Sequence, residues 1–300
     1  MAQSPRLREA SPLRRRSVAA ALVGVAAVWG STFPVVKTAV ERMPPMEFLA
    51  LRFSIAGAAL AVAWWPSVRG LGRSGVMAGV AAGAVLFAGY AFQTVGLQYT
   101  EATNAGFVTG LFVVFTPLLA AVVLRRAPGR GALLGVALAT AGLFLLSATE
   151  GFRPRAGDLI VLGAAASFAV HFVLLGRYSP AYPPTGLTAV QMVSAAAIAL
   201  VASVASEDLV VPAGGYLWFA ILVSALVSSA LGFFVQTMAQ RYLSPTRTAL
   251  ILVSEPAFAG LAGFLLLGEV LTGRGWTGAG LILAGMVVAE LSPQRSTVEG

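Results

Sequence analysis

Residues 75–97 read GVMAGVAAGAVLFAGYAFQTVGL and contain no charged side chain. A helix rises about 1.5 Å per residue and the hydrocarbon layer of a bilayer is about 30 Å thick, so about 20 apolar residues suffice to cross it. The stretch is long enough for one crossing. It also lacks the alternation of apolar and polar residues that marks a strand of a membrane β-barrel. It therefore predicts a transmembrane helix.

Similar stretches fill nearly all of the 300-residue chain, in which 58% of residues are hydrophobic and 11% are charged. Soluble domains have about 45–50% apolar and about 25% charged residues. The mean hydropathy is +0.84. We therefore expect an all-α integral membrane protein with ten transmembrane helices, at residues 17–40, 45–65, 75–97, 103–124, 131–147, 157–176, 185–206, 215–239, 246–268 and 275–291. The basic start followed by the apolar residues 18–28 resembles a secretory signal, but the apolar run continues to Val40, which favours an uncleaved first helix.

The positive residues predict the orientation, since cytoplasmic loops carry an excess of Lys and Arg. The N-terminal tail and every second loop hold fourteen arginines, namely Arg6, Arg8, Arg14, Arg15, Arg16, Arg69, Arg73, Arg125, Arg126, Arg130, Arg177, Arg241, Arg247 and Arg295. The opposite loops hold four, Arg42, Arg153, Arg155 and Arg274. We expect a multi-pass protein of the cell (inner) membrane, with residues 1–16 and 292–300 as cytoplasmic tails.

Composition argues against several other classes of protein. The net charge of +8 follows mostly from the topology, and no basic stretch is interleaved with aromatic residues, so nucleic acid is not an expected partner. There is no cysteine, and the only lysine, Lys37, lies outside any phosphate-binding Gly-rich loop. We expect no cofactor and no metal. The alternatives left open are a channel or facilitator without ion coupling and a membrane-embedded enzyme, for which paired acids or a nucleophile with a base are missing.

The chain contains an internal repeat. Gln93-Thr94, Tyr99 and Gly142 recur 143 residues later as Gln236-Thr237, Tyr242 and Gly285, whereas Trp29, Thr32 and Pro45 match Phe168, His171 and Pro184 at an offset of 139. This pattern predicts two five-helix repeats at residues 17–147 and 157–291, joined by a linker at 148–156. Five is odd, so the second repeat enters the membrane from the opposite side. Inverted repeats are typical of alternating-access carriers, although Ala- and Gly-rich helices also resemble one another by composition alone.

Several short motifs resemble the EamA-type branch of the drug/metabolite transporter superfamily. They are Trp29-Gly-Ser-Thr-Phe-Pro-Val-Val-Lys37, Leu51-Arg52-Phe53, Gly96-Leu-Gln-Tyr-Thr100, Glu255-Pro256 and Leu267-Gly268-Glu269. The resemblance covers residues 17–291 and implies a ten-helix carrier of small metabolites, often an exporter of amino acids. Thr32 is a departure, because many relatives have Asn there. The fourth helix likewise has Thr116-Pro117 where the ninth has Glu255-Pro256.

Ionisable side chains inside the bilayer are functional candidates, since each costs about 2.5–3.5 kcal/mol to insert. Glu255 is a candidate site for a proton or a substrate ammonium group; the alternative is a structural carboxylate. Arg52 could receive a substrate carboxylate, pair with Glu255, or brace neighbouring helices. His171, the only histidine, is a candidate protonation switch or a neutral lining residue.

Uncharged residues complete the predicted site. Gln93 and Gln236 match in the repeat, and Tyr90 lies one turn before Gln93 on the same helix face. Aromatic side chains, including Phe92 and Phe172, could line the apolar part of a pocket, while Thr94, Thr237 and Gln240 could also be interhelical contacts. The predicted substrate-binding set is Trp29, Thr32, Phe33, Arg52, Tyr90, Gln93, Tyr99, His171, Gln236 and Glu255, and the predicted kinks are Pro34, Pro117 and Pro256.

The sequence thus predicts a secondary transporter that moves small polar metabolites by alternating access at a midplane cavity. Hydrophobic or aromatic amino acids are the expected cargo, and export is the expected direction. The expected partners are the metabolite, the lipid bilayer and protons. The glycine spacing at Gly79 and Gly83 and at Gly131 and Gly135 predicts tight helix crossings, in a monomer or a weak homodimer.

Overall fold

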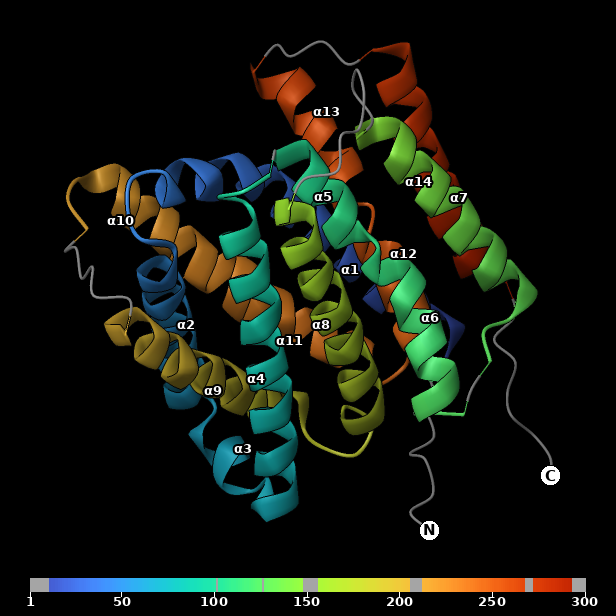
Figure 1. The fold of residues 1–300 in the computed structure, drawn as a ribbon. Coiled ribbons are helices and arrows are strands. Elements are labelled where there is room, and N and C mark those ends of the chain that lie inside the picture. The colour runs from blue at the N-terminus through green and yellow to red at the C-terminus, as the bar shows by residue number, and fades with distance from the viewer. Residues whose placement is uncertain are drawn as a thin grey trace.

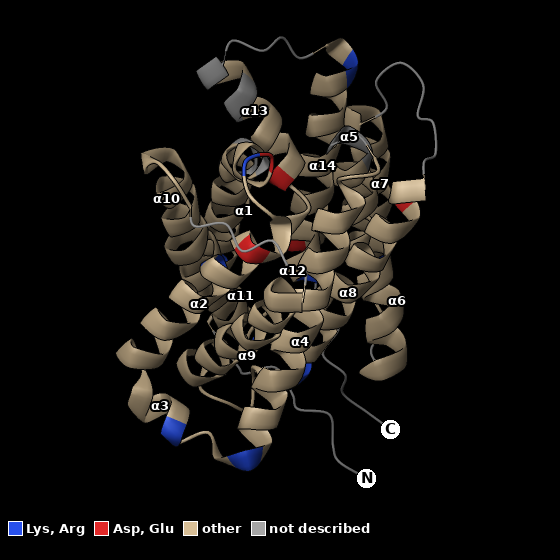
Figure 2. Cartoon of the chain, turned by 60° about the vertical axis from the view of Figure 1, so that its left-hand side comes forward, with Lys and Arg blue, Asp and Glu red and all other residues tan. Residues whose placement is uncertain are grey.

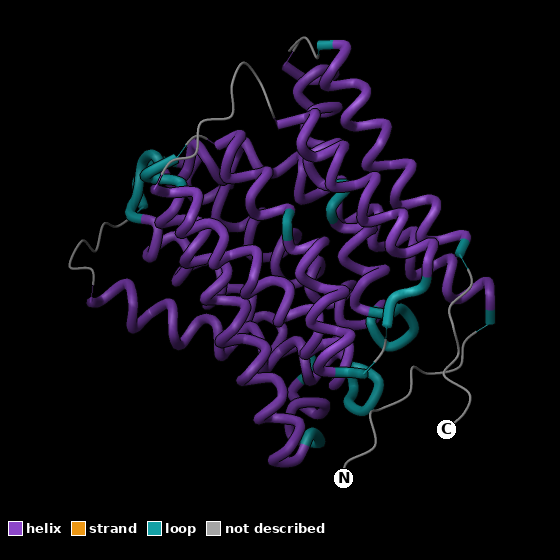
Figure 3. Tube along the Cα trace, turned by 45° about the vertical axis from the view of Figure 1, so that its right-hand side comes forward, coloured by secondary structure: helices purple, strands orange, loops and turns teal. Residues whose placement is uncertain are grey.

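The computed structural model describes residues 11–100, 102–125, 127–147, 156–205, 212–267 and 272–292. This part of the chain is helical, with short connections and no strand (Figure 3). The helices of the first half are α1 (Pro12–Val40), α2 (Pro45–Ala63), α3 (Trp65–Arg69), α4 (Gly72–Gly96), α5 (Ala102–Gly110), α6 (Phe112–Val123) and α7 (Arg130–Ser147). Those of the second half are α8 (Ala156–Tyr178), α9 (Pro184–Ala205), α10 (Gly215–Leu222), η1 (Val223–Leu231), α11 (Gly232–Ala239), α12 (Pro245–Leu252), α13 (Glu255–Leu267) and α14 (Gly273–Leu291).

Among the described residues, seven helical segments are long and apolar enough to cross a membrane. They are α2, α4, the stretch Ala105–Val123 in α5 and α6, α7, α8, α9, and the continuous run of α10, η1 and α11. The helices α1, α12 with α13, and α14 occupy the other three predicted spans, and their crossing stays a prediction. The bundle has few charges between its ends, with basic residues at α3 and the start of α4 (Figure 2).

The surface of the bundle is apolar as well as its interior. Leu118 is 61% exposed, Leu159 76% and Val201 71%. Burying such side chains is favourable, so contiguous apolar surface of this kind marks a contact with lipid or another apolar partner. The bundle is built to be surrounded by hydrocarbon.

Equivalent helices of the two halves run antiparallel. A Cβ added at Gly135 would lie 2.7 Å from the carbonyl oxygen of Gly285, and one added at Gly142 would lie 2.5 Å from that of Gly278. From Gly135 to Gly142 the residue number rises along α7, while the number of the contacted residue on α14 falls from 285 to 278. The two helices, which lie side by side in Figure 1, therefore point in opposite directions. This is the direction expected of inverted repeats. It also shows why glycine is needed: two backbones touch here.

The other predicted glycine crossings also lie within one chain. Gly79 faces Val190, and Gly83 faces Gln191 and Ser194, all three on α9. A Cβ at Gly83 would lie 2.3 Å from the Gln191 carbonyl oxygen, so this position admits no side chain without separating the two helices. The Gly-x-x-x-Gly spacing therefore packs α4 on α9.

Two of the predicted spans are interrupted. The ninth predicted helix stops at Leu252 and restarts at Glu255. Leu252 is four residues before Pro256, and a proline ring clashes with the carbonyl group at that distance along a helix. In the fourth predicted helix the break is at Leu111, while Pro117 lies inside α6. The helix α1 continues through Pro34, whose side chain is outside the described set.

Candidate functional site

A cavity of about 130 Å³ lies where the two halves meet. One water needs roughly 10–15 Å³ of such a volume, so the space could hold several waters or a small metabolite. Its wall comes from both halves: α1, α2, α4, α5 and α6 on one side and α8, η1, α11 and α13 on the other. Val40 and Leu97 line it too, so the cavity reaches the ends of α1 and α4.

Most of the predicted site residues face this cavity. Eight of the ten line it: Trp29, Thr32, Arg52, Tyr90, Gln93, His171, Gln236 and Glu255. Tyr99 does not; it is 59% exposed and lies in the turn after α4. The side chain of Phe33 is outside the described set. The roles of these residues stay predictions, but their positions bring them to one place.

Arg52 is held in a fixed position by two neutral partners. Its Nε donates to Ser229 Oγ at 2.6 Å, and a terminal nitrogen donates to the Tyr90 hydroxyl at 3.2 Å. The guanidinium carbon lies 4.7 Å from the Tyr90 ring centre, within cation–π range. Arg52 is 4% exposed. The guanidinium group of Arg52 is therefore fixed beside the cavity. Among the described residues it has no carboxylate partner.

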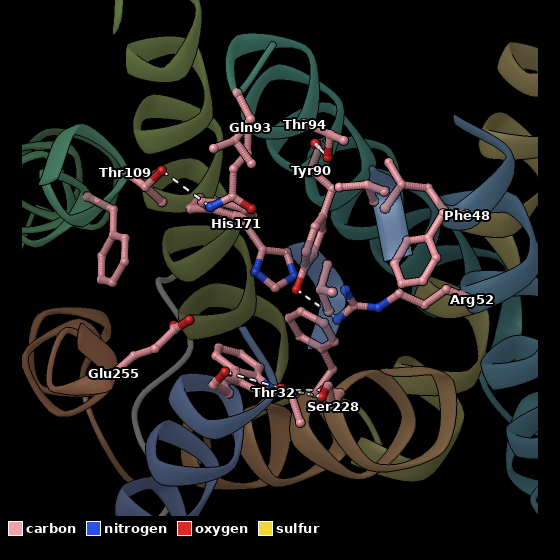
Figure 4. A pocket seen from close by; sticks show the side chains of 18 of the residues that line it. Thr32, Phe48, Arg52, Tyr90, Gln93, Thr94, Thr109, His171, Ser228 and Glu255 are labelled. Atoms are coloured by element: carbon pink, nitrogen blue, oxygen red, sulfur yellow. Dashed lines mark hydrogen bonds between the residues drawn. The ribbon is translucent and has the colours of Figure 1, made fainter. Parts of the chain in front are cut away.

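Glu255 faces the cavity from the opposite side. It is the first residue of α13, directly after the break in the ninth predicted helix, and its side chain points toward the cavity centre (Figure 4). Among the described residues its carboxylate makes no hydrogen bond or ion pair. Arg52 is its electrostatic neighbour. One buried cation and one carboxylate thus share the cavity and remain separated.

The π-helical segment η1 forms part of the cavity wall. The element η1 interrupts the α-helical pattern between α10 and α11, and such turns are frequent at functional sites. Its Ser228 carbonyl accepts from Trp29 Nε1 at 2.9 Å, and its hydroxyl lies 3.2 Å from Thr32 Oγ1. Ser229, the next residue, accepts from Arg52. The turn therefore connects α1 and α2 to the second half of the chain.

The hydrogen bonds of Gln240 and Gln236 leave the side-chain oxygen of Gln236 without a donor among the described residues. Gln240 Nε2 donates to the Phe172 carbonyl at 2.7 Å, which directs Gln240 Oε1 toward Gln236 Nε2, 3.4 Å away. Gln236 Oε1 then has no hydrogen-bond partner among the described residues, although it is buried. Buried polar atoms are nearly always paired. Gln236 lines the cavity, so this oxygen is available to a ligand.

Aromatic rings form the rest of the wall. Tyr90 packs edge-on against Phe168 at 5.4 Å between ring centres, and Trp29 lies 5.2 Å from Phe233. His171 is 1% exposed, and its Nε2 lies 3.1 Å from Gln191 Oε1. Phe172 lines the cavity as expected, whereas Phe92 is 44% exposed and faces Gly163 outside it. Among the described residues no group of three or more His, Asp or Glu is placed to hold a metal ion.

Sequence reasoning missed several lining residues, including Phe168, Phe233, Ser228 and Thr109. Two of them could have been found from the repeat. Phe168 is the partner of Trp29 at offset 139, and Phe233 is the partner of Tyr90 at offset 143. Thr109 accepts from Gln93 Nε2 at 3.3 Å, a contact that no sequence pattern indicates.

The sequence matches the EamA-like transporter family twice, over residues 16–148 and 155–290. It is 33% identical over 251 residues to an uncharacterized transporter of Archaeoglobus fulgidus, covering 82% of this chain and 77% of that protein. It is 26% identical to the uncharacterized transporter YyaM of Bacillus subtilis, covering 81% of this chain and 84% of YyaM. A solved crystal structure with 21% identity has the same fold, with a TM-score of 0.77 over 91% of this chain and 96% of that chain. The chain is a multi-pass membrane transporter with two repeats and belongs to the EamA-like transporter family.

Proposed function

We propose that this transporter exports amino acids with hydrophobic or aromatic side chains by alternating access. One observation carries the proposal: Arg52 and Glu255 face the same aromatic-walled cavity from different helices and do not pair with each other. Two opposite charges held apart in a buried cavity are costly unless a ligand joins them. A zwitterion supplies both missing partners.

Each end of an amino acid has a matching group. The planar guanidinium of Arg52 suits a carboxylate, with which it can form two parallel hydrogen bonds. The carboxylate of Glu255 and the free Gln236 oxygen both accept, so both suit an ammonium group. The rings of Phe168 and Phe233 offer an apolar surface to the side chain of the ligand.

Glu255 also suggests how transport is driven. A carboxylate that binds an ammonium group must be ionised, whereas a protonated one cannot form that ion pair. Glu255 would therefore hold either a proton or the substrate, and the two would cross the membrane in opposite directions. This makes proton exchange the proposed coupling.

The two repeats supply the switching device of this proposal. Carriers with inverted repeats bind substrate at the repeat interface and often use interrupted helices there. Here the break at Val253 and Ser254 lies beside Glu255. With both termini in the cytoplasm, as the arginine distribution predicts, the described cavity would extend toward the outer face, where α1 ends and α2 begins.

Counterflow in proteoliposomes tests the proposal. Vesicles containing the purified protein are loaded with one unlabelled amino acid, and uptake of the labelled compound is followed at two pH values. We expect saturable exchange of hydrophobic or aromatic amino acids that depends on pH. Exchange that ignores pH would remove the proton coupling, and no exchange of any amino acid would remove the substrate class.

A further inference from the structure

A second hollow lies on the peripheral surface of the bundle and shares no lining residue with the central cavity. It is a groove with a volume of about 240 Å³ between α1 and α14, with α12 at its base. Two charged residues, Arg16 and Glu290, stand at its polar end. The other lining residues are all apolar: Ala19, Ala20, Val23, Ile251, Met286, Val287 and Leu291.

The spacing on both helices makes this groove amphipathic along its length. Ala19, Ala20 and Val23 follow Arg16 by three, four and seven residues, which places them on one face of α1. Met286 precedes Glu290 by four residues on α14. Each helix therefore contributes a charge at one end of the groove and apolar surface beyond it.

The polar end carries a surplus of positive charge. Three guanidinium groups, those of Arg247, Arg15 and Arg16, act electrostatically on the carboxylate of Glu290. Arg247 also donates to the backbone carbonyl of Ser292. In the described part of the chain, Glu290 Oε2 is buried and accepts no hydrogen bond. Among the described residues, the arginines that act on Glu290 outnumber this one carboxylate, and Glu290 Oε2 is an unused acceptor.

The groove opens onto the apolar surface of the bundle. Val287 is 46% exposed and Leu291 78% exposed. In a protein that spans a bilayer, such a surface is in contact with lipid. A molecule in this groove would enter from the membrane, and it would have an anionic head and an apolar tail.

We propose that the groove binds an anionic phospholipid of the phosphatidylglycerol type. The phosphate would lie against Arg16, a headgroup hydroxyl would donate to Glu290 Oε2, and an acyl chain would follow Ala20 and Val23 into the groove. Basic clusters between helices are known to suit such head groups. This site is independent of the transported substrate and of the central cavity.

Native mass spectrometry of the full chain tests this site. The purified protein is titrated with phosphatidylglycerol and, separately, with phosphatidylethanolamine of the same acyl chains. We expect preferential binding of phosphatidylglycerol, and about fivefold weaker binding in Arg16→Gln, the factor expected for one arginine near an anionic head group. Arg73→Gln is the matched control, since Arg73 is an exposed arginine on α4 outside the groove.

A second pair of variants tests the acyl-chain part. Ala20→Trp fills the groove and should abolish the preference, whereas Ala58→Trp changes an exposed alanine on α2 and should leave it intact. Equal affinity for the two lipids, or equal losses in Arg16→Gln and Arg73→Gln, would overturn the proposal. Should Ala20→Trp fail to fold, the arginine pair alone decides.

Discussion

Replacing Arg52 with glutamine should remove the preference of the protein for ligands that have a carboxylate. The comparison needs two ligands, an amino acid and the amine that lacks its carboxyl group, and two proteins, the wild type and Arg52→Gln. If Arg52 receives the carboxylate, the wild type binds the amino acid more tightly than the amine, and the variant binds both about equally.

The magnitude follows from the contacts of Arg52. A hydrogen bond that involves a charged group contributes about 1.5–3 kcal/mol, so the wild-type preference should be about 10- to 150-fold in Kd. Arg52 also donates to Ser229 and Tyr90, and losing these two bonds of a charged group should cost the fold up to about 3–6 kcal/mol. This change in folding stability is the same whichever ligand is bound. The ratio of the two affinities therefore isolates the recognition role from the structural one.

Equilibrium binding to the detergent-purified protein, with thermal unfolding of each variant, measures both quantities. Tyr90→Phe is the matched control, because it removes the hydroxyl partner of Arg52 while keeping the cation and the ring. We expect Tyr90→Phe to lower stability slightly and to preserve the preference for the carboxylate. If Arg52→Gln lowers both affinities by the same factor, Arg52 is only a structural residue and the assignment of the carboxylate to it is wrong.

Three further predictions follow from the described contacts. Glu255→Gln should abolish the pH dependence of amino-acid counterflow, and Glu41→Gln, on the exposed turn after α1, should not; equal pH profiles in all three proteins would exclude Glu255 as the proton site. Gln236→Leu removes the free acceptor and should raise the Kd of the amino acid at least about tenfold, with little change if the ammonium group lies elsewhere. Gly278→Ala would place a Cβ 2.6 Å from the Gly142 carbonyl oxygen and should destabilise the protein by about 1–3 kcal/mol. Gly280→Ala, on the same helix, meets nothing within 4 Å and should leave stability unchanged or raise it by up to about 1 kcal/mol, because alanine favours a helix more than glycine does. Thermal unfolding of the two variants measures the difference.

The sequence was sufficient for the membrane class and for much of the site because both depend on simple physical constraints. Apolar runs of about 20 residues leave few alternatives to a helix in a bilayer. Polar residues inside such runs are costly, so they collect where they can find partners or water. Trp29, Arg52 and Gln236 could be placed in one cavity for this reason, although they are far apart in the chain.

The remaining details depend on tertiary packing that no local pattern records. The π-helical turn at Val223–Leu231 presents two serines to α1 and α2, and nothing in its composition distinguishes it from an ordinary apolar helix. Tyr99 matched Tyr242 in the repeat, yet it lies in an exposed turn. The repeat drew attention to Tyr99, but Tyr99 follows the end of α4 at Gly96 and therefore lies outside the cavity.

The two halves share their scaffold and differ in their charges, and the proposed substrate explains why. At the repeat offset of 139, Arg52 corresponds to Gln191, and Glu255 corresponds to Thr116. If both charges were repeated in each half, the site would bury two arginines and two glutamates, and the like charges would repel strongly in a low dielectric. With one charge in each half, the cavity contains a cation and an anion that offset each other across its width. Such a site binds a zwitterion without a change in net charge, and under alternating access it releases the zwitterion when the halves move.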